Sequence, residues 1–279
     1  MATQDGRLPD LTLRNGPPTA RWFRYANGIG VATLIRRELG RDFEIWTYTI
    51  AAPAVQTTLF ALIFMLAWPQ DRPLLMGGLA YMQFLIPGLI ASAMLTRSFE
   101  SSAFSLVMDK LEGMITDLLA APLTPGELLL GYTVAAATSG LSVAGVVWIA
   151  MLPFGASLPA NPAALASFAV LGAVMMALLG RIAGIISAKW DQLSAFQTFI
   201  VMPLVFLSGT FFALDRLPEA SRPLFQFNPL FYVIDGLRFG FTGRSEAPVL
   251  LGLAVISGVV LAVWILCYVM IRRGYKLKP

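Results

Sequence analysis

The chain has 279 residues, of which 57% are apolar and 13% are charged, and its mean hydropathy is +0.72. An ordinary soluble domain is about half apolar and roughly a quarter charged, so this composition excludes a soluble globular protein. The chain contains no histidine and one cysteine, Cys267. It therefore lacks the usual ligands of zinc, haem and iron–sulfur sites and the common Ser–His and Cys–His nucleophile pairs. We expect no catalytic residue, cofactor or metal in this chain.

Five blocks without charged residues cover more than half of the chain, at 45–70, 73–96, 128–180, 192–214 and 247–271. A bilayer core about 30 Å thick is crossed by about 20 apolar helical residues, so four blocks fit one span each and the longest fits two. The longest block is divided at 153–162 by a proline-rich turn, which is tolerated only outside the hydrocarbon. We therefore predict an all-α membrane protein with six transmembrane helices within 46–271.

The basic residues indicate the orientation of these spans. We find no cleavable signal peptide in 1–44, and six spans place both termini on one side of the membrane. Fifteen of the 20 arginine and lysine residues then lie on that side. The positive-inside rule makes it cytoplasmic, so we expect a multi-pass protein of the inner (cytoplasmic) membrane with both termini in the cytoplasm. The excess of basic over acidic residues reflects this topology and contact with membrane lipid, and no nucleic-acid partner is expected.

One charged residue, Arg181, lies within the fourth predicted span at 163–188. Its side chain either snorkels to the nearer interface or points into the helix bundle. We favour snorkelling, because Lys189 and the interface follow soon after it.

The segment before the first span has the pattern of an amphipathic helix. Apolar residues recur every three or four positions on one face, and charged residues occupy the other. We predict an interfacial helix over 28–45 that lies flat at the cytoplasmic head groups; the alternative is a helix packed on the rest of the protein. Upstream, 1–27 is expected to be a disordered cytoplasmic tail, and 272–279 forms a basic cytoplasmic tail. The interfacial residues are Val31, Ile35, Arg36, Arg37, Leu39, Phe43 and Trp46.

The connection between the second and third spans, 97–127, is too long and too regular for a passive turn. Its apolar residues keep helical spacing over 104–118, and its acids and Lys110 take the remaining face. We interpret it as a docking helix whose apolar side chains enter a groove of a cytosolic partner. The alternative is that the apolar face covers the cytoplasmic end of the bundle.

The connection between the fifth and sixth spans, 215–246, carries six aromatic residues among prolines and glycines. Short aromatic helices broken by proline favour a hairpin that re-enters the outer leaflet, and an interfacial aromatic belt is the alternative. Asp235 and Arg238 are one helical turn apart, so we expect them to pair.

Four stretches of the chain resemble the membrane subunits of ABC-2 type exporters, in the branch of the YadH-type permeases and the nodulation-factor exporter permease. They are 81–90 (YMQFLIPGLI), 118–125 (LLAAPLTP), 207–212 (LSGTFF) and 228–238 (NPLFYVIDGLR), and the last is the most specific. The resemblance extends over nearly all of the chain after about residue 28.

This resemblance implies a homodimer with two copies of a separately encoded cytosolic ABC ATPase, which binds ATP and Mg. It implies an ATPase-docking coupling helix formed by Met108, Asp109, Leu111, Glu112, Met114, Ile115, Asp117 and Leu118. It also implies an outer re-entrant gate formed by Phe225, Phe227, Pro229, Phe231, Tyr232, Asp235 and Arg238. The chain itself is expected not to be an enzyme: 126–133 has the glycine spacing of a phosphate-binding loop, but Tyr132 stands in the place of the lysine.

We therefore expect the permease subunit of an ATP-driven exporter. The substrate path is predicted between the first, second and fifth spans, along Thr57, Thr58, Ser208 and Gly209. Because these spans lack charge, an amphipathic substrate, such as a lipid, a lipid-linked glycan or a hydrophobic drug, fits better than an ion. The alternative is an ion-coupled secondary transporter of a hydrophobic compound, which would be expected to carry ionisable groups for ion coupling within its spans.

Overall fold

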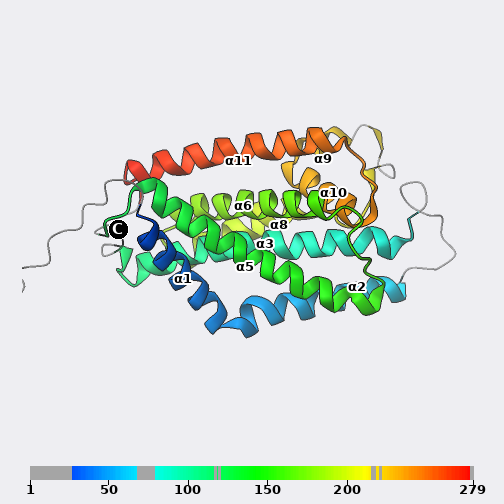
Figure 1. Cartoon of the computed structure of the whole chain (residues 1–279), viewed down its shortest axis with the longest axis horizontal. Helices are drawn as coiled ribbons and strands as arrows, with labels where there is room; N and C mark the ends of the chain where they lie inside the picture. The colour runs from blue at the N-terminus through cyan, green and yellow to red at the C-terminus, as the bar shows by residue number, and fades with distance from the viewer. Residues whose placement is uncertain are drawn as a thin grey trace, which may run out of the picture.

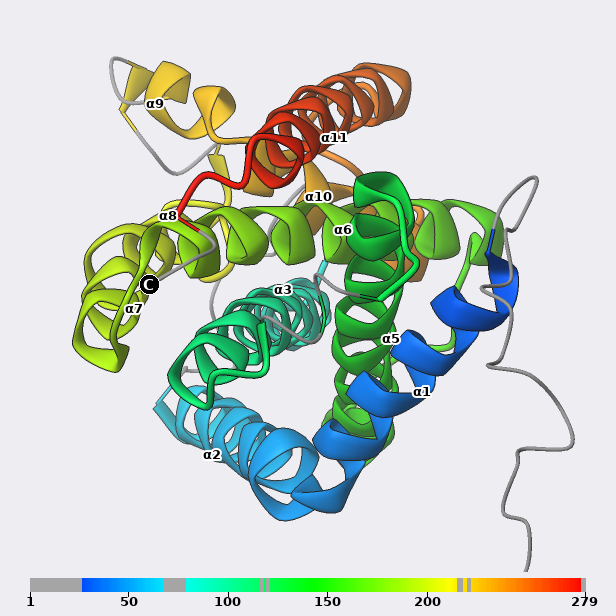
Figure 2. The ribbon, with the colours of Figure 1, turned by 90° about the vertical axis from the view of Figure 1, so that its left-hand side faces the viewer.

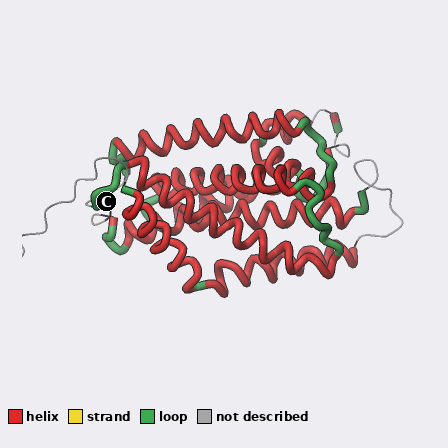
Figure 3. Tube along the Cα trace, in the orientation of Figure 1, coloured by secondary structure: helices red, strands yellow, loops and turns green. Residues whose placement is uncertain are grey.

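The computed structural model describes residues 27–67, 79–115, 118, 121–214, 218–219 and 222–276. Its regular elements are helices that lie side by side along one long axis (Figure 1 and Figure 3). The predicted all-α class is thus confirmed. The predicted disordered tail lies outside the described residues except for Asn27. The elements are α1 (Gly28–Glu44), η1 (Thr47–Ala51), α2 (Ala52–Ala67), α3 (Tyr81–Leu111), α5 (Pro125–Met151), η2 (Leu152–Phe154), α6 (Pro162–Ile186), α7 (Trp190–Phe196), η3 (Gln197–Val201), α8 (Met202–Phe206), α9 (Arg222–Phe227), α10 (Pro229–Thr242) and α11 (Val249–Arg272).

Four helices among the described residues are long and apolar enough to cross a membrane: Thr47–Ala67, Pro125–Phe154, Pro162–Ile186 and Val249–Arg272. They coincide with the first, third, fourth and sixth predicted spans. The second predicted span falls partly on α3, whose C-terminal half carries charged residues, and the fifth falls on the shorter run of α7, η3 and α8. Six spans therefore remain a prediction.

Helix α3 forms the centre of the bundle. It is surrounded by α2, α5 and α6, while α11 packs on the far side of α6 (Figure 2). Small residues allow the close packing, because a Cβ on Gly180 of α6 would lie 2.3 Å from the carbonyl oxygen of Phe99 in α3. Between α5 and α6 the chain turns at the predicted place, where Gly155 has a φ of +93° and Pro162 begins the next helix.

Helix α1 agrees within one residue with the predicted segment 28–45. Asn27 caps its N-terminus, since the Asn27 side chain accepts a hydrogen bond from the Gly30 amide at 2.8 Å, and the helix crosses α5 diagonally (Figure 1). Val31, Ile35 and Leu39 are half-buried, whereas Arg36, Arg37, Phe43 and Trp46 are exposed. The structure therefore combines the two readings of this segment: one side packs on the bundle, and a mixed apolar and basic side stays exposed. Its position at the head groups remains a prediction.

The predicted docking helix 104–118 is not one continuous helix. Residues 104–111 form the last turns of α3, and the helix ends at Leu111 before Gly113, whose φ of +73° is the left-handed conformation common after a helix end. Asp117 lies outside the described residues.

Arg181 corrects another expectation. Its side chain points into the bundle and is only 2% exposed, with the guanidinium carbon 3.7 Å from the centre of the Tyr132 ring. Within the described part of the chain, its three guanidinium nitrogens have no hydrogen-bond partner. Snorkelling was the wrong choice, because the cation–π contact with Tyr132 holds the side chain inside.

Candidate functional site

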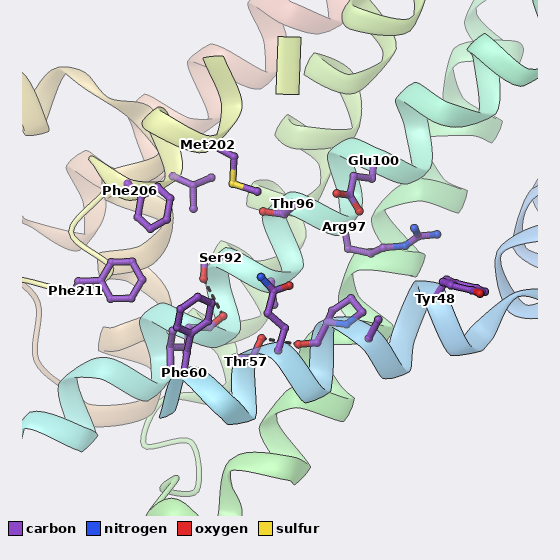
Figure 4. Close-up of a pocket in the computed structure, with 16 residues that line it drawn as sticks. Tyr48, Thr57, Phe60, Ser92, Thr96, Arg97, Glu100, Met202, Phe206 and Phe211 are labelled. Carbon is purple, nitrogen blue, oxygen red and sulfur yellow. Dashed lines mark hydrogen bonds between the residues drawn. The ribbon is translucent and has the colours of Figure 1, made fainter. Parts of the chain in front are cut away.

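A groove of about 290 Å³ opens between α2, α3 and α8 (Figure 4). These are the helices on which the first, second and fifth predicted spans fall, so the groove lies where the substrate path was expected. Its lining combines polar and aromatic side chains. It includes Gln56, Thr57 and Phe60 from α2, Ser92, Thr96, Arg97 and Glu100 from α3, and Met202, Phe206 and Phe211 from α8 and the turn that follows.

The polar end of the groove contains Arg97 and Glu100 (Figure 4). Arg97 is nearly buried; its Nη2 lies 2.8 Å from Oδ1 of Asp42, and its Nε donates to the Ser139 hydroxyl at 3.0 Å. The Glu100 carboxylate accepts a hydrogen bond from the Gln197 side-chain amide. The cation of Arg97 is thus paired with Asp42, whereas the hydrogen bond to Glu100 comes from a neutral amide, and Arg97 attracts Glu100 as a second anion.

The other end of the groove is aromatic. The ring of Phe211 lies 5.5 Å from the ring of Phe206 and 5.5 Å from that of Phe64, measured between centroids. Phe60 and Phe206 remain exposed beside the groove, so its wall is continuous with the apolar outer surface of α2 and α8. A hydrocarbon or aromatic group can therefore enter sideways without crossing a polar barrier.

Of the four residues predicted to line the substrate path, one lines this groove. Thr57 lines the groove, but Thr58 is not among the lining residues and donates its hydroxyl to the Ala54 carbonyl at 2.7 Å. Ser208 and Gly209 are buried at the turn after α8: the Ser208 hydroxyl donates to the Val205 carbonyl, and the Gly209 carbonyl accepts from Arg238 at 2.9 Å. Neither residue is among those that line the groove.

Sequence reasoning missed the lining residues Gln56, Arg97, Glu100, Phe206 and Phe211. Arg97 and Glu100 directly follow the uncharged block 73–96, which was the one available signal, but they were assigned to the connection after it. Phe206 and Phe211 occur in a uniformly apolar stretch, so nothing in the pattern distinguishes them from lipid-facing residues.

The segment predicted to dock the ATPase lies at the end of the bundle where α3 stops. Met108, Leu111, Glu112 and Met114 are exposed there, while Ile115 and Leu118 are buried against α5 and α11. The segment therefore presents an exposed apolar face and also covers the bundle end, as the two readings of the sequence separately proposed.

Asp109, predicted on the exposed acidic face, is instead fully buried. It accepts hydrogen bonds from Arg37 at 2.6 Å and Arg41 at 3.3 Å, both on α1, and from the Tyr132 hydroxyl of α5 at 2.7 Å. Glu38 of α1 extends this ionic cluster, with a 2.5 Å contact to Arg41 and a hydrogen bond from Ser105. The cluster joins α1 to the end of α3, so a displacement of one helix would also move the other.

Lys110 has a different role. Its ammonium group donates to the carbonyl oxygens of Gly184, Ile185 and Ser187 at 2.7–3.1 Å and thereby caps the C-terminal end of α6. Burial, together with the positive charges of Lys276 and Arg181, lowers the pKa of Lys110 to about 8. The group stays mainly protonated at neutral pH, which matches its three carbonyl acceptors.

The described residues of the predicted gate 215–241 include α9 and most of α10, which are separated at Asn228. The Asp235 carboxylate accepts from the backbone amides of Glu246 and Ala247 at 2.8 and 3.0 Å, and its nearest Arg238 nitrogen is 4.0 Å away. The expected pairing of Asp235 with Arg238 is therefore present only as a long contact. Of the predicted aromatic gate residues, Phe225 and Phe231 are buried, Tyr232 is half-buried and Phe227 is exposed.

Helices of this length and hydropathy define a multi-pass membrane protein. The sequence profile of the ABC-2 type transporter family matches residues 30–242. The chain belongs to the ABC-2 type transporter family, as its resemblance to that family implied.

Two similar proteins cover most of the chain. The inner membrane transport permease YadH of Escherichia coli (strain K12) is 30% identical over 252 residues, which covers 90% of this chain and 97% of YadH. Nodulation protein J of Rhizobium leguminosarum bv. viciae is 29% identical over 270 residues, which covers 88% of this chain and 98% of that protein.

Proposed function

We propose that this chain is the membrane subunit of an ATP-driven exporter that moves an amphipathic substrate, such as a lipid, a lipid-linked glycan or a hydrophobic drug, outward across the inner membrane. Each copy of the chain has six spans with both termini in the cytoplasm, and two copies form a homodimer. Two copies of a cytosolic ABC ATPase bind beneath them and supply the ATP hydrolysis. The similarity to YadH, an inner membrane transport permease, supports the membrane and the transport role.

The observation that carries the proposal is the groove between α2, α3 and α8. It has charged and amide groups at one end, aromatic groups at the other, and apolar surface beside it. A pocket with this division holds a molecule whose head and tail have different polarity. The tail can remain in lipid while the head moves along the polar wall of α3.

The end of α3 supplies the link to the ATPase. Met108, Leu111 and Met114 form an exposed apolar surface, and the buried cluster around Asp109 connects the same turns to α1. Closure of the ATPase dimer would push on this surface and shift the balance between inward-facing and outward-facing packings.

The proposal is tested by reconstitution. The chain is co-purified with its ATPase, the bound lipids are identified by mass spectrometry, and transport of these lipids is measured in proteoliposomes with and without ATP. Export that requires ATP is expected. Transport of a small hydrophilic solute and of no lipid would refute the amphipathic substrate. Uphill transport by the chain alone without nucleotide would favour the ion-coupled alternative.

Filling the groove should block transport. We expect Ala93→Trp, on the groove wall of α3, to remove most of the ATP-dependent transport, because an indole occupies the space that the substrate needs. The matched control is Ala254→Trp on the exposed face of α11, which should transport like the wild type. Equal transport by both variants would show that the substrate passes elsewhere.

Introducing negative charge into the exposed apolar surface at the end of α3 tests whether the ATPase docks there. The double substitution Leu111→Asp and Met114→Asp should abolish co-purification of the ATPase, because both side chains are exposed and a carboxylate in an apolar contact is costly. Leu158→Asp, which is also exposed but lies in the turn between α5 and α6, should keep the ATPase bound. Unchanged ATPase recovery with the double variant would contradict this assignment.

A further inference from the structure

We infer that the groove selects amphiphiles with a protonated amine as head group, and that Glu100 is the residue that binds it. This inference rests on the proposed function, since it names the chemistry of the substrate in the same groove. It follows from the charge balance of the lining and from the hydrogen bonds that the lining residues already make.

The groove is lined by two charged side chains of the described residues, Arg97 and Glu100. Arg97 is neutralised by Asp42 at 2.8 Å, and Asp42 also accepts a hydrogen bond from Ser101 at 2.6 Å. Glu100 accepts a hydrogen bond from the neutral side chain of Gln197, and the Arg97 charge that Asp42 already neutralises also attracts it. After the Arg97–Asp42 pair is counted as neutral, one negative charge remains at the polar end, and it favours a cation.

The hydroxyl groups of the wall point to the same class of ligand. The Thr57 hydroxyl already donates to the Pro53 carbonyl at 2.7 Å, and the Ser92 hydroxyl donates to the Leu89 carbonyl at 3.0 Å. A hydroxyl that has given its one proton to its own helix can only accept from a ligand. The Glu100 carboxylate and these two hydroxyls are therefore acceptors, which suit an ammonium group with several N–H donors better than a sulfate or phosphate. The donors of the same lining include the Gln56 amide and the Arg97 guanidinium, and Asp42 already pairs with the latter.

The dimensions of the groove fit a tail attached to such a head. Along α3 the lining extends from Glu100 to Leu89, a distance of about 16 Å at 1.5 Å per residue. Beyond the polar end this wall is formed by Leu89 and Ala93, and the opposite sides by Phe60, Phe206 and Phe211. An alkyl chain or a flat aromatic system can lie there, with its amine at Glu100 (Figure 4).

The test measures binding to the purified complex with its ATPase in nanodiscs of zwitterionic lipid. The probes share one tail and differ in the head: dodecylamine, which is protonated at pH 7.5, dodecyltrimethylammonium and dodecyl sulfate. Isothermal titration, corrected with empty nanodiscs, gives the affinities. We expect dodecylamine to bind about tenfold more tightly than dodecyl sulfate, a difference of about 1.4 kcal/mol. The trimethylammonium probe, which has the charge and no N–H donor, should lie between them.

Two variants separate recognition of charge from a structural role. Glu100→Gln removes the charge and retains a side chain that can hydrogen-bond Gln197, so it should eliminate the preference for dodecylamine. Gln56→Lys places a cation on the opposite wall, at an exposed position, and should weaken dodecylamine binding even if the first variant folds poorly. Glu44→Gln, an exposed acid of α1 outside the groove, is the matched control and should retain the preference.

Equal or tighter binding of dodecyl sulfate, or an unchanged preference in both groove variants, would overturn the inference. The same complex is also assayed for ATP-dependent transport in proteoliposomes. Amine preference without ATP-dependent transport would refute the proposed function and leave the assignment of Glu100 intact. ATP-dependent transport without amine preference would refute the assignment of Glu100 and leave the proposed function intact.

Discussion

Replacing Gly180 by alanine should lower the free energy of unfolding by about 2 kcal/mol, because the new methyl group overpacks the contact between α6 and α3. Its Cβ would lie 2.3 Å from the Phe99 carbonyl oxygen, 3.0 Å from the carbonyl carbon and 3.1 Å from the Cα atom. All three are backbone atoms, so no side chain can rotate away and the two helices must separate. Equilibrium unfolding in mixed micelles measures the change.

Gly258 provides the matched control for this substitution. It also lies within a long apolar helix, α11, but a Cβ built there meets no atom within 4 Å. Gly258→Ala should therefore stabilise the protein by up to about 1 kcal/mol through helix propensity alone. If both variants shifted stability by the same amount, the close contact of α6 with α3 would not be a determinant of the packing.

The sequence predicted the parts of the fold that depend on local pattern. Uncharged blocks located the four long apolar helices, because burial in lipid demands a continuous apolar run. The prolines at 153–162 located the turn between α5 and α6, since proline cannot donate within a helix. The periodicity of 28–45 located α1 within one residue.

The sequence did not predict the places where residues far apart in the chain neutralise one another's charge. Arg97 was assigned to a connection because its charge ends the uncharged block 73–96, yet Asp42, from the segment before the first span, pairs with it inside the bundle. Asp109 looked solvent-exposed because a helical wheel places it opposite the apolar stripe, but α1 brings Arg37 and Arg41 over that face. Helical periodicity identifies which residues share a face and cannot identify what covers it.

The same limit applied to the groove. Sequence reasoning placed the path between the three helices that line the groove, because they hold small and hydroxyl side chains, but only Thr57 of its four residues lines the groove. Thr58 and Thr57 are neighbours with identical side chains, and only the packing of α2 on α3 decides that Thr57 faces inward. Side-chain direction at a helix crossing is thus a property of the assembled bundle.

Replacing Asp109 by asparagine should destabilise the protein by about 3 kcal/mol, near the lower end of the cost of breaking a buried ion pair. The amide keeps the size of the side chain and removes the charge that faces Arg37, Arg41 and the Tyr132 hydroxyl. The two arginine side chains are 39% and 30% exposed, so water recovers part of the loss. Because these contacts hold α1 against the bundle, limited proteolysis should also cut near α1 sooner than in the wild type.

Glu112→Gln is the control that makes this prediction specific, since it is the same acid-to-amide change three residues further along the chain. Glu112 is exposed, so the substitution should leave the unfolding free energy within about 0.5 kcal/mol of the wild type. Its effect is expected in the affinity for the ATPase, where a surface acid contributes to docking. Loss of stability in the Glu112 variant, or wild-type stability in the Asp109 variant, would mean that α1 is held by its apolar contacts with α5 and not by the ionic cluster.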